Sequence, residues 1–394
     1  MIENGPVRIG VVGAGHRGGT FVDELRHLPQ GRLTALCDVL PARLNLFHQR
    51  WQLDGVLRTT DLDQLLRGDL VDAVLITVPD RFHRAVAVKC LEAGKDILLE
   101  KPLAPTAEDC RAIIAAHRKS GRLLQMGFVL RATRFYRKVK EIVDSGRLGQ
   151  IMFVRACEYL SVEHGASFMT RWHRKKANAG TFLLSKCSHD LDLLNWIIGS
   201  RPTHVASFGG NDFFRPGRGG AALCSQCGRA ECRYRFENFR GWHYLSGEDV
   251  IPGTDLCAFN DDKDVVDNQV VILEYANHVR ATFELQMFYP EESTRFITIG
   301  GEKGYLSGCL EKNRLRLHCN DDDVVEEMSI PSGVSGHAGG DREFLRGFIA
   351  AVATRQAPVA DLSAGLACNV IAEAVEKARL EERVVTIDPR EYDG

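Results

Sequence analysis

The sequence has no apolar run that approaches the ~18 residues needed to cross a membrane. Its charge is also nearly balanced, because 50 Lys and Arg residues face 52 Asp and Glu residues, for a formal net charge of -2. This balance excludes the basic surface expected of a nucleic-acid-binding protein. The segment Met1–Pro6 lacks the charged-then-apolar order of a secretory signal. We therefore expect a cytoplasmic protein without a membrane or nucleic-acid partner.

The chain is long and apolar enough to form a large core. Its 394 residues, 44% of them hydrophobic, suggest two or three domains. Nine of the twelve cysteines are scattered singly, mostly in apolar stretches, which is typical of buried reduced thiols.

The first third of the sequence alternates between short β-rich runs and helical patterns. Strands are predicted over Val7–Val12, Leu33–Cys37, Val71–Val78 and Ile97–Leu99, and helices over Thr20–Leu28, Ala85–Ala93 and Ala107–Lys119. Strands that alternate with helices indicate crossover connections and a doubly wound parallel sheet. We assign residues 1–124 to this domain.

Strand patterns dominate the rest of the chain. Several are close enough for hairpin connections, so residues 125–394 are predicted to form an α+β domain with an open, mainly antiparallel sheet. Helices are expected over Phe182–Ile198, Asp341–Thr354 and Ser363–Glu381. Residues 209–262 are the least regular stretch and are interpreted as an insertion or lid. The fold class is therefore α/β overall.

A glycine-rich segment, Gly13-Ala14-Gly15-His16-Arg17-Gly18, directly follows the first strand. It fits the Rossmann dinucleotide fingerprint, in which glycines allow a tight turn and a close approach of the backbone to a pyrophosphate. Asp38 ends the second strand, where a carboxylate would accept ribose hydroxyls. Because Asp38 would repel a 2′-phosphate, NAD is favoured over NADP, although Arg43 could reach such a phosphate.

Further motifs give this sequence a resemblance to a known family. They are Thr77-Val78-Pro79-Asp80-Arg81-Phe82-His83, Glu100-Lys101-Pro102, Gln125-Met126-Gly127-Phe128 with Arg131, Ser145-Gly146-Arg147-Leu148-Gly149, and His337-Ala338-Gly339-Gly340-Asp341. Together with the glycine segment, they resemble the Gfo/Idh/MocA oxidoreductases over almost the whole chain. The resemblance implies a Rossmann domain followed by a domain whose open sheet makes oligomer contacts, so a dimer or tetramer is expected. It also implies that His16, Arg17, Thr77, Pro79, His83, Glu100 and Lys101 contact the cofactor.

The same resemblance makes Lys101 the active-site lysine. A second motif of the family, Asp followed by His four residues later and Asp three beyond, is matched by His189 and Asp192, but its first position is Ser185. Serine cannot act as a base at neutral pH, so His189 is the first candidate for general base, with Lys101 as its proton-sharing partner.

Other residues fall in segments that line the substrate pocket of the family. They are Arg131, Tyr159, Trp172, Arg174 and Lys186, with His189. The cationic run His173-Arg174-Lys175-Lys176 suggests an anionic substrate, or it is a solvated loop.

Three functions remain open from the residues. The first is an NAD-dependent dehydrogenase that oxidises a ring hydroxyl of a sugar, sugar derivative or inositol. The second is a redox-neutral NAD-dependent glycosidase, for example of sulfoquinovosides, which oxidises, eliminates, hydrates and reduces again. The third is a non-catalytic NAD sensor, against which the presence of Lys101 and His189 argues.

Three cysteines are clustered at Cys224, Cys227 and Cys232. Two cysteines separated by two residues form the commonest half of a structural zinc site, and Cys257 or His243 could supply a fourth ligand. Free thiols and a disulfide are the alternatives.

Overall fold

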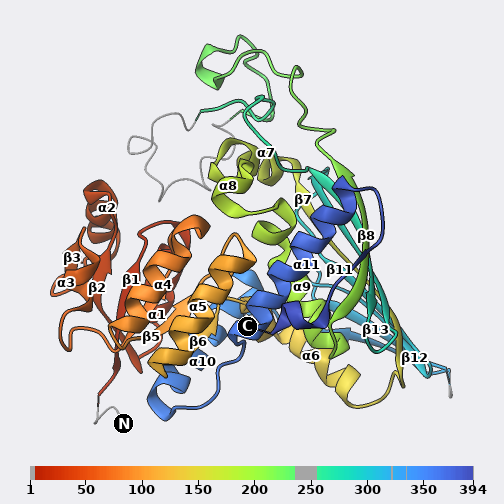
Figure 1. Cartoon of the computed structure of the whole chain (residues 1–394), viewed down its shortest axis with the longest axis horizontal. Coiled ribbons are helices and arrows are strands. Elements are labelled where there is room, and N and C mark those ends of the chain that lie inside the picture. The colour runs from red at the N-terminus through yellow and green to blue at the C-terminus, as the bar shows by residue number, and fades with distance from the viewer. Residues whose placement is uncertain (1–4, 236–254, 321–322, 334, 394) are drawn as a thin grey trace.

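The computed structural model describes residues 5–235, 255–320, 323–333 and 335–393. Two sheets, each with its own helices, lie side by side with helices packed between them (Figure 1). The smaller sheet belongs to the N-terminal unit and the larger one to the C-terminal unit.

The N-terminal unit is a six-stranded parallel sheet in the order β3-β2-β1-β4-β5-β6. Its strands are β1 (Val7–Val12), β2 (Gly31–Cys37), β3 (Leu57–Thr59), β4 (Ala73–Ile76), β5 (Asp96–Leu99) and β6 (Leu124–Met126). Its helices are α1 (His16–Leu25), α2 (Pro41–Trp51), α3 (Leu62–Leu66), α4 (His83–Glu92) and α5 (Ala107–Ser120). The predicted doubly wound parallel sheet is confirmed. Its strand order reverses between β1 and β4, and ligands bind such sheets at that point, beyond the carboxyl ends of the strands.

A helix from near the C-terminus completes the core of this first unit. Helix α10 (Gly340–Thr354) packs Phe344, Phe348 and Ile349 into the same apolar cluster as Ile9 and Phe21 of the N-terminal unit. The two units therefore share buried surface, and α10 brings residues before its N-terminus close to the glycine-rich segment.

The C-terminal unit is a nine-stranded sheet in the order β14-β13-β12-β11-β7-β10-β9-β8-β15. Its strands are β7 (Ile151–Ser161), β8 (Pro202–Gly210), β9 (Asn268–Tyr275), β10 (Arg280–Tyr289), β11 (Phe296–Gly301), β12 (Gly304–Cys309), β13 (Arg314–Cys319), β14 (Val325–Ser329) and β15 (Val385–Thr386). Neighbouring strands are antiparallel except β7 and β10, which are parallel. This outcome confirms the mainly antiparallel second sheet.

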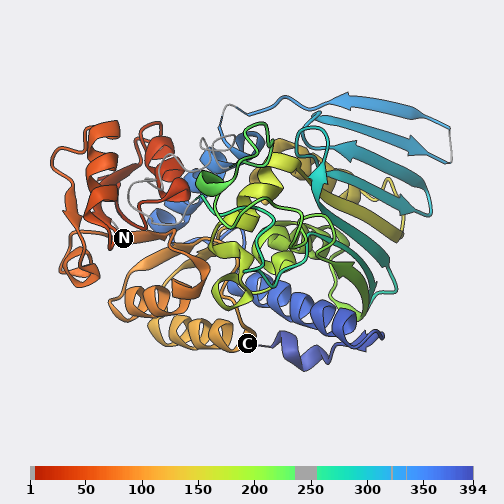
Figure 2. The same cartoon turned by 90° about the horizontal axis from the view of Figure 1, so that it is seen from above.

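Helices cover one face of the larger sheet. The helices of this unit are α6 (Arg134–Asp144), α7 (Val162–Thr170), α8 (Lys176–Ala179), α9 (Phe182–Ile198) and α11 (Leu362–Leu380). Helix α9 packs on β7 and α11 packs on β8, between the two sheets (Figure 2). On β9, Val271 and Leu273 point into this core, whereas Val270 and Ile272 point outward and are about half exposed. The outward face is thus open and apolar. Within the described ranges, no helix combines the length and apolar character needed to span a bilayer.

Candidate active site

The loop between β1 and α1 has the shape of a phosphate cradle. Gly13 has φ +104°, and a Cβ there would lie 2.7 Å from the Thr77 carbonyl carbon, while a Cβ on Gly18 would lie 2.1 Å from the Gly13 oxygen. A Cβ on Gly15 would instead meet no atom within 4 Å, and no side chain caps α1. The backbone at Gly15 therefore faces open space beside the N–H groups of a helix start, which fits a pyrophosphate.

Asp38 lies beside this cradle and is buried. Its two carboxylate oxygens accept hydrogen bonds from the backbone N–H groups of Ala14, at 2.7 Å, and Leu40, at 2.9 Å. Each oxygen keeps lone-pair capacity for a ribose hydroxyl. Arg43 approaches to 3.6 Å between Nη1 and Asp38 Oδ2, so its charge is partly balanced by the carboxylate.

Arg17 joins the nucleotide loop to both units. Its Nε donates to Glu100 Oε1 at 2.7 Å, and its Nη2 donates to Asp341 Oδ1 at 2.9 Å. Burial raises the pKa of Asp341, but the charges of Arg17 and His337 outweigh it and hold that pKa far below its usual range. Arg17 and Glu100, which were predicted to contact the cofactor, therefore bind each other and order the loop.

The loops after β4 and β5 are tied together by His83. The imidazole is fully buried, with Nδ1 2.8 Å from the Pro102 carbonyl oxygen and Nε2 3.1 Å from that of Val78. Both ring nitrogens face carbonyl oxygens of the protein, and the contact between His83 and the cofactor stays a prediction. Thr77 also acts within the protein, since its Oγ1 donates to the Gly13 oxygen at 2.7 Å, and Pro79 precedes the short helix η1 (Asp80–Phe82).

Lys101 lies between the two units. Its Nζ donates to the Ser185 carbonyl oxygen at 2.5 Å, and Ser185 Oγ donates to Asp80 Oδ2 at 3.3 Å. Burial lowers the pKa of Lys101, and the charge of Asp80 opposes that effect. Burial also raises the pKa of Asp80 to about 8. The carboxyl group beside the lysine thus comes from position 80 and not from 185. Asp80 was not predicted as a site residue from its motif, although an acidic residue directly after Pro79 was the available signal.

His189 lies one helical turn after Ser185 on α9. Its ring is 4% exposed, and Nδ1 has no hydrogen-bond partner in the part of the chain that the structure describes. Burial lowers its pKa well below 6.5, and the charges of Lys101 and His337 add to this. His189 is therefore a neutral imidazole at physiological pH, which can accept a proton.

Two further histidines lie close by. The ring centroid of His337 is 5.8 Å from that of His189, and its Nδ1 is 3.0 Å from Asp341 Oδ2. The pKa of His16 falls to about 4, first through burial and then through the charges of Arg17, Arg171 and His337. His337, which the sequence analysis quoted only as part of a motif, thus links the nucleotide loop to His189.

The three cations predicted to bind substrate each have a carboxylate partner. Arg131 donates to both oxygens of Asp192, at 2.7 and 2.6 Å. Lys186 Nζ lies 2.5 Å from Glu158 Oε1, and Arg174 Nη2 lies 2.6 Å from Asp262 Oδ2. Each of the three cations therefore has a counter-charge within the protein, and its role in substrate binding stays a prediction.

The two aromatic candidates differ in position. Tyr159 follows Glu158 on β7 and points to the opposite face of the sheet, where its hydroxyl donates to Glu284. Side chains alternate along a strand, so Glu158 faces Lys186 and Tyr159 cannot. Tyr159 therefore lies on the sheet face away from Lys186, and its role in substrate binding stays a prediction. Trp172 stacks on His173 with ring centroids 3.6 Å apart.

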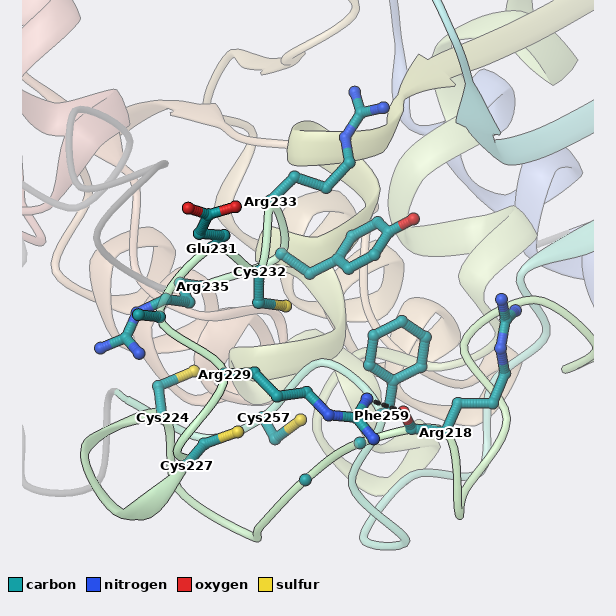
Figure 3. A pocket seen from close by; sticks show the side chains of 14 residues that line it. Arg218, Cys224, Cys227, Arg229, Glu231, Cys232, Arg233, Arg235, Cys257 and Phe259 are labelled. Carbon is teal, nitrogen blue, oxygen red and sulfur yellow. Dashed lines mark hydrogen bonds between the residues drawn. The ribbon is translucent and has the colours of Figure 1, made fainter.

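The clustered cysteines line one cavity of about 650 Å³. Cys224, Cys227, Cys232 and Cys257 all contribute to its wall (Figure 3). Among the described residues, no group of three His, Cys, Asp or Glu side chains is placed to hold a metal ion. The arrangement therefore does not support the predicted zinc site. His243 lies outside the described residues.

Two protein-family models match the chain. One, described as "Oxidoreductase family, NAD-binding Rossmann fold" within the Gfo/Idh/MocA family, matches residues 7–128. The other, described as "Oxidoreductase family, C-terminal alpha/beta domain", matches residues 140–387. Together they cover nearly the whole sequence.

Individual proteins show the same likeness. YteT of Bacillus subtilis (strain 168) is 25% identical over 342 residues, which are 78% of this chain and 80% of YteT. An inositol 2-dehydrogenase of Corynebacterium glutamicum is 30% identical over 201 residues. That match covers 50% of this chain and 56% of the dehydrogenase, so the chain spans about half the length of this relative.

Two solved structures share the fold. A levoglucosan dehydrogenase in complex with NADH and L-sorbose superposes with a TM-score of 0.79 at 16% identity, covering 98% of this chain and 99% of that one. An oxidoreductase domain protein from Kribbella flavida superposes with a TM-score of 0.77 at 22% identity, covering 97% and 99%. At these identities the likeness is one of fold.

Proposed function

The chain belongs to the Gfo/Idh/MocA oxidoreductase family, and from this membership we propose that it oxidises a ring hydroxyl of a sugar, sugar derivative or inositol with NAD as its cofactor. The observation that best supports this proposal is that Lys101, Asp80 and the neutral imidazole of His189 lie close together beside the glycine-rich loop. The named relatives support the substrate class, since they include inositol 2-dehydrogenases and a levoglucosan dehydrogenase bound to NADH.

The residues of the cradle fit the cofactor. The open backbone at Gly15 and the start of α1 would hold the pyrophosphate, and Asp38 would accept the ribose hydroxyls. When bound, the nicotinamide supplies the hydride acceptor. The protein contributes orientation, exclusion of water and proton handling.

Proton handling is divided between His189 and the Lys101–Asp80 pair. The neutral imidazole can take the proton of a substrate hydroxyl directly. The charges of Lys101 and Asp80 each oppose the effect of burial on the other's pKa, and both groups contact Ser185, so the pair can share in the handling of the proton. Lys101 would polarise the reacting oxygen while His189 accepts the proton.

An experiment on the purified protein tests this proposal. Denatured protein is assayed for released NAD(H), and sugars and glycosides are screened for NADH formation and for free aglycone. Net NADH with a free sugar supports the dehydrogenase, whereas aglycone release without net NADH supports the glycosidase and overturns our proposal. Lys101→Ala should lower turnover by ~100-fold or more while NADH binding survives. His117→Ala, on α5 and outside the site, is the matched control.

We also propose that the open face of the larger sheet joins copies of this chain. Its outward residues include Phe208, at 71% exposure, Val270 and Ile272. Such a face is costly to leave in water. Light scattering after gel filtration should report a dimer or tetramer, and Ile272→Asp should shift it toward monomer. A wild-type monomer would contradict this. The singly placed, buried cysteines, such as Cys37, Cys90 and Cys110, favour a reducing compartment such as the cytoplasm.

A further inference from the structure

Arg171 directly follows helix α7, and only some of the N–H donors of its guanidinium make hydrogen bonds within the protein. The side chain folds back so that Nε donates to the Ser167 carbonyl oxygen at 3.0 Å and Nη2 donates to Ser167 Oγ at 3.1 Å. Its guanidinium carbon lies 4.9 Å from the ring centroid of Phe168. A guanidinium has five N–H donors, so the edge formed by Nη1 and the second hydrogen of Nη2 remains for another acceptor. That edge has the geometry of a two-oxygen anion.

Arg171 differs from the cations that follow it in sequence. Arg174 and Lys175 both pair with Asp262, and Lys176 pairs with Glu376. Arg171 makes no ion pair with any described carboxylate, although it is half-buried. Burial lowers its pKa to about 10, and no acidic neighbour opposes this. A desolvated cation without a counter-ion is costly unless a ligand provides the negative charge.

The position of Arg171 places it at the site already described. Its charge lowers the pKa of His16 on the nucleotide loop and that of His164 on α7. The charge of His337 lowers the pKa of both of these histidines and also that of His189. Arg171 therefore lies on the C-terminal unit, across from the glycine-rich loop, around the same group of imidazoles as the proposed base.

We propose that Arg171 binds an anionic group of the substrate, a carboxylate, phosphate or sulfonate, through its Nη1–Nη2 edge. This inference rests on the proposed function, because it adds a charge requirement to the same sugar-type substrate. The sequence predicted an anionic substrate from the run His173–Lys176, but carboxylates of the protein neutralise Arg174, Lys175 and Lys176. Selectivity for an anion would come from Arg171, which lies two residues before that run.

Binding measurements on the NADH-saturated protein test the proposal. Calorimetry at low salt compares D-glucose with D-glucuronate and D-glucose 6-phosphate, D-galactose with D-galacturonate, and D-mannose with D-mannuronate. At least one anionic probe should bind ~10-fold or more tightly than its neutral partner, and Arg171→Gln should reduce that preference to about 2-fold or less. Arg171→Lys keeps the charge but loses the two-donor edge, so it should fall between these values. Arg383→Gln removes an exposed arginine that is paired with Glu381 after the end of α11, and it should leave the preference unchanged.

Three results would overturn the inference. The first is a wild-type protein that prefers no anionic probe. The second is an Arg171→Gln protein that keeps the preference for the anionic probe. If that variant does not fold, an Arg171→Lys protein that keeps the full preference is the corresponding result. The third is an Arg171→Gln protein whose NADH affinity falls while its sugar preference persists, because the arginine would then serve the cofactor's pyrophosphate. Failure of the proposed function is separate: anion preference without hydride transfer from any probe rejects the reaction, whereas equal oxidation of neutral and anionic sugars rejects only the role of Arg171.

Discussion

Replacement of His189 by alanine separates catalysis from folding more cleanly than other changes at this site. The imidazole is 4% exposed and neutral, and its Nδ1 has no hydrogen-bond partner among the residues described. Removing the ring therefore leaves no buried donor or acceptor without its partner. The structural loss includes the ring contacts with Phe128 and His337, at centroid distances of 6.1 and 5.8 Å, and the void that the ring leaves.

The two effects of His189→Ala have different sizes. Loss of a general base costs ~10²- to 10⁴-fold in turnover, which is about 2.7–5.4 kcal/mol of transition-state stabilisation. The void left in the protein costs on the order of 1–3 kcal/mol of folding stability. We therefore expect a protein that is folded at assay temperature, binds NADH like the wild type and turns over at least ~100-fold more slowly.

The assay measures NADH formation with the best substrate from the sugar screen, beside NADH titration and thermal melting. Free imidazole, added to the variant, should restore part of the turnover, since the alanine leaves space where the ring was. The His117→Ala control should match the wild type in all three measurements. Turnover of His189→Ala within a few-fold of wild type would refute the assignment of the base. A large loss of NADH binding, with no rescue by imidazole, would show that the ring is structural.

Three other predictions concern the cofactor, the lysine and the cysteines. Asp38→Ala should narrow the preference for NADH over NADPH in calorimetry, because it removes the charge that repels a 2′-phosphate; comparable binding of both by the wild type would contradict the choice of NAD. Burial raises the pKa of Asp80 to about 8, so turnover should rise as the pH passes through 8 and that carboxyl becomes able to accept a proton beside Lys101. Asp80→Asn should remove this inflection and slow turnover. An unchanged pH profile in that variant would reject the pairing. Replacement of both Cys224 and Cys227 with Ser should lower the melting temperature and leave turnover nearly unchanged. Elemental analysis then decides the state of the clustered cysteines. About one zinc ion per chain indicates a bound metal, and less than ~0.2 zinc ion per chain indicates thiols or a disulfide.

Local features were predictable from the sequence because they depend on near neighbours in the chain. Gly13 needs its positive φ, and Gly18 its missing Cβ, whatever the rest of the protein does. Alternation of strands and helices likewise indicated the parallel sheet. Lys101 and His189 could be proposed from the sequence because they lie in short motifs, and Lys101 of the first unit contacts Ser185, one helical turn before His189.

The charge partners were decided only by the tertiary structure. Asp80 meets Ser185 across 105 residues, and Arg131 meets Asp192 across 61. With 52 carboxylates in the chain, sequence spacing does not indicate which of them lies within 3 Å of a given cation. For this reason Arg131, Arg174 and Lys186 resembled substrate ligands in the sequence, whereas Arg171 did not stand out.

The packing between the two units could not be predicted from the sequence either. Helix α10 would have the same apolar side whether it packed on the first or on the second sheet. Only the folded chain places Phe344 and Phe348 against the first sheet. That placement brings Asp341 to Arg17, and His337 to the vicinity of His189. Helical periodicity determines that a face is apolar, and it carries no information about which surface that face will meet. The sequence by itself therefore indicated the Rossmann fold and the candidate reactive groups. Long-range packing decided which charged side chains have a partner of opposite charge within the protein and which are left to bind a ligand.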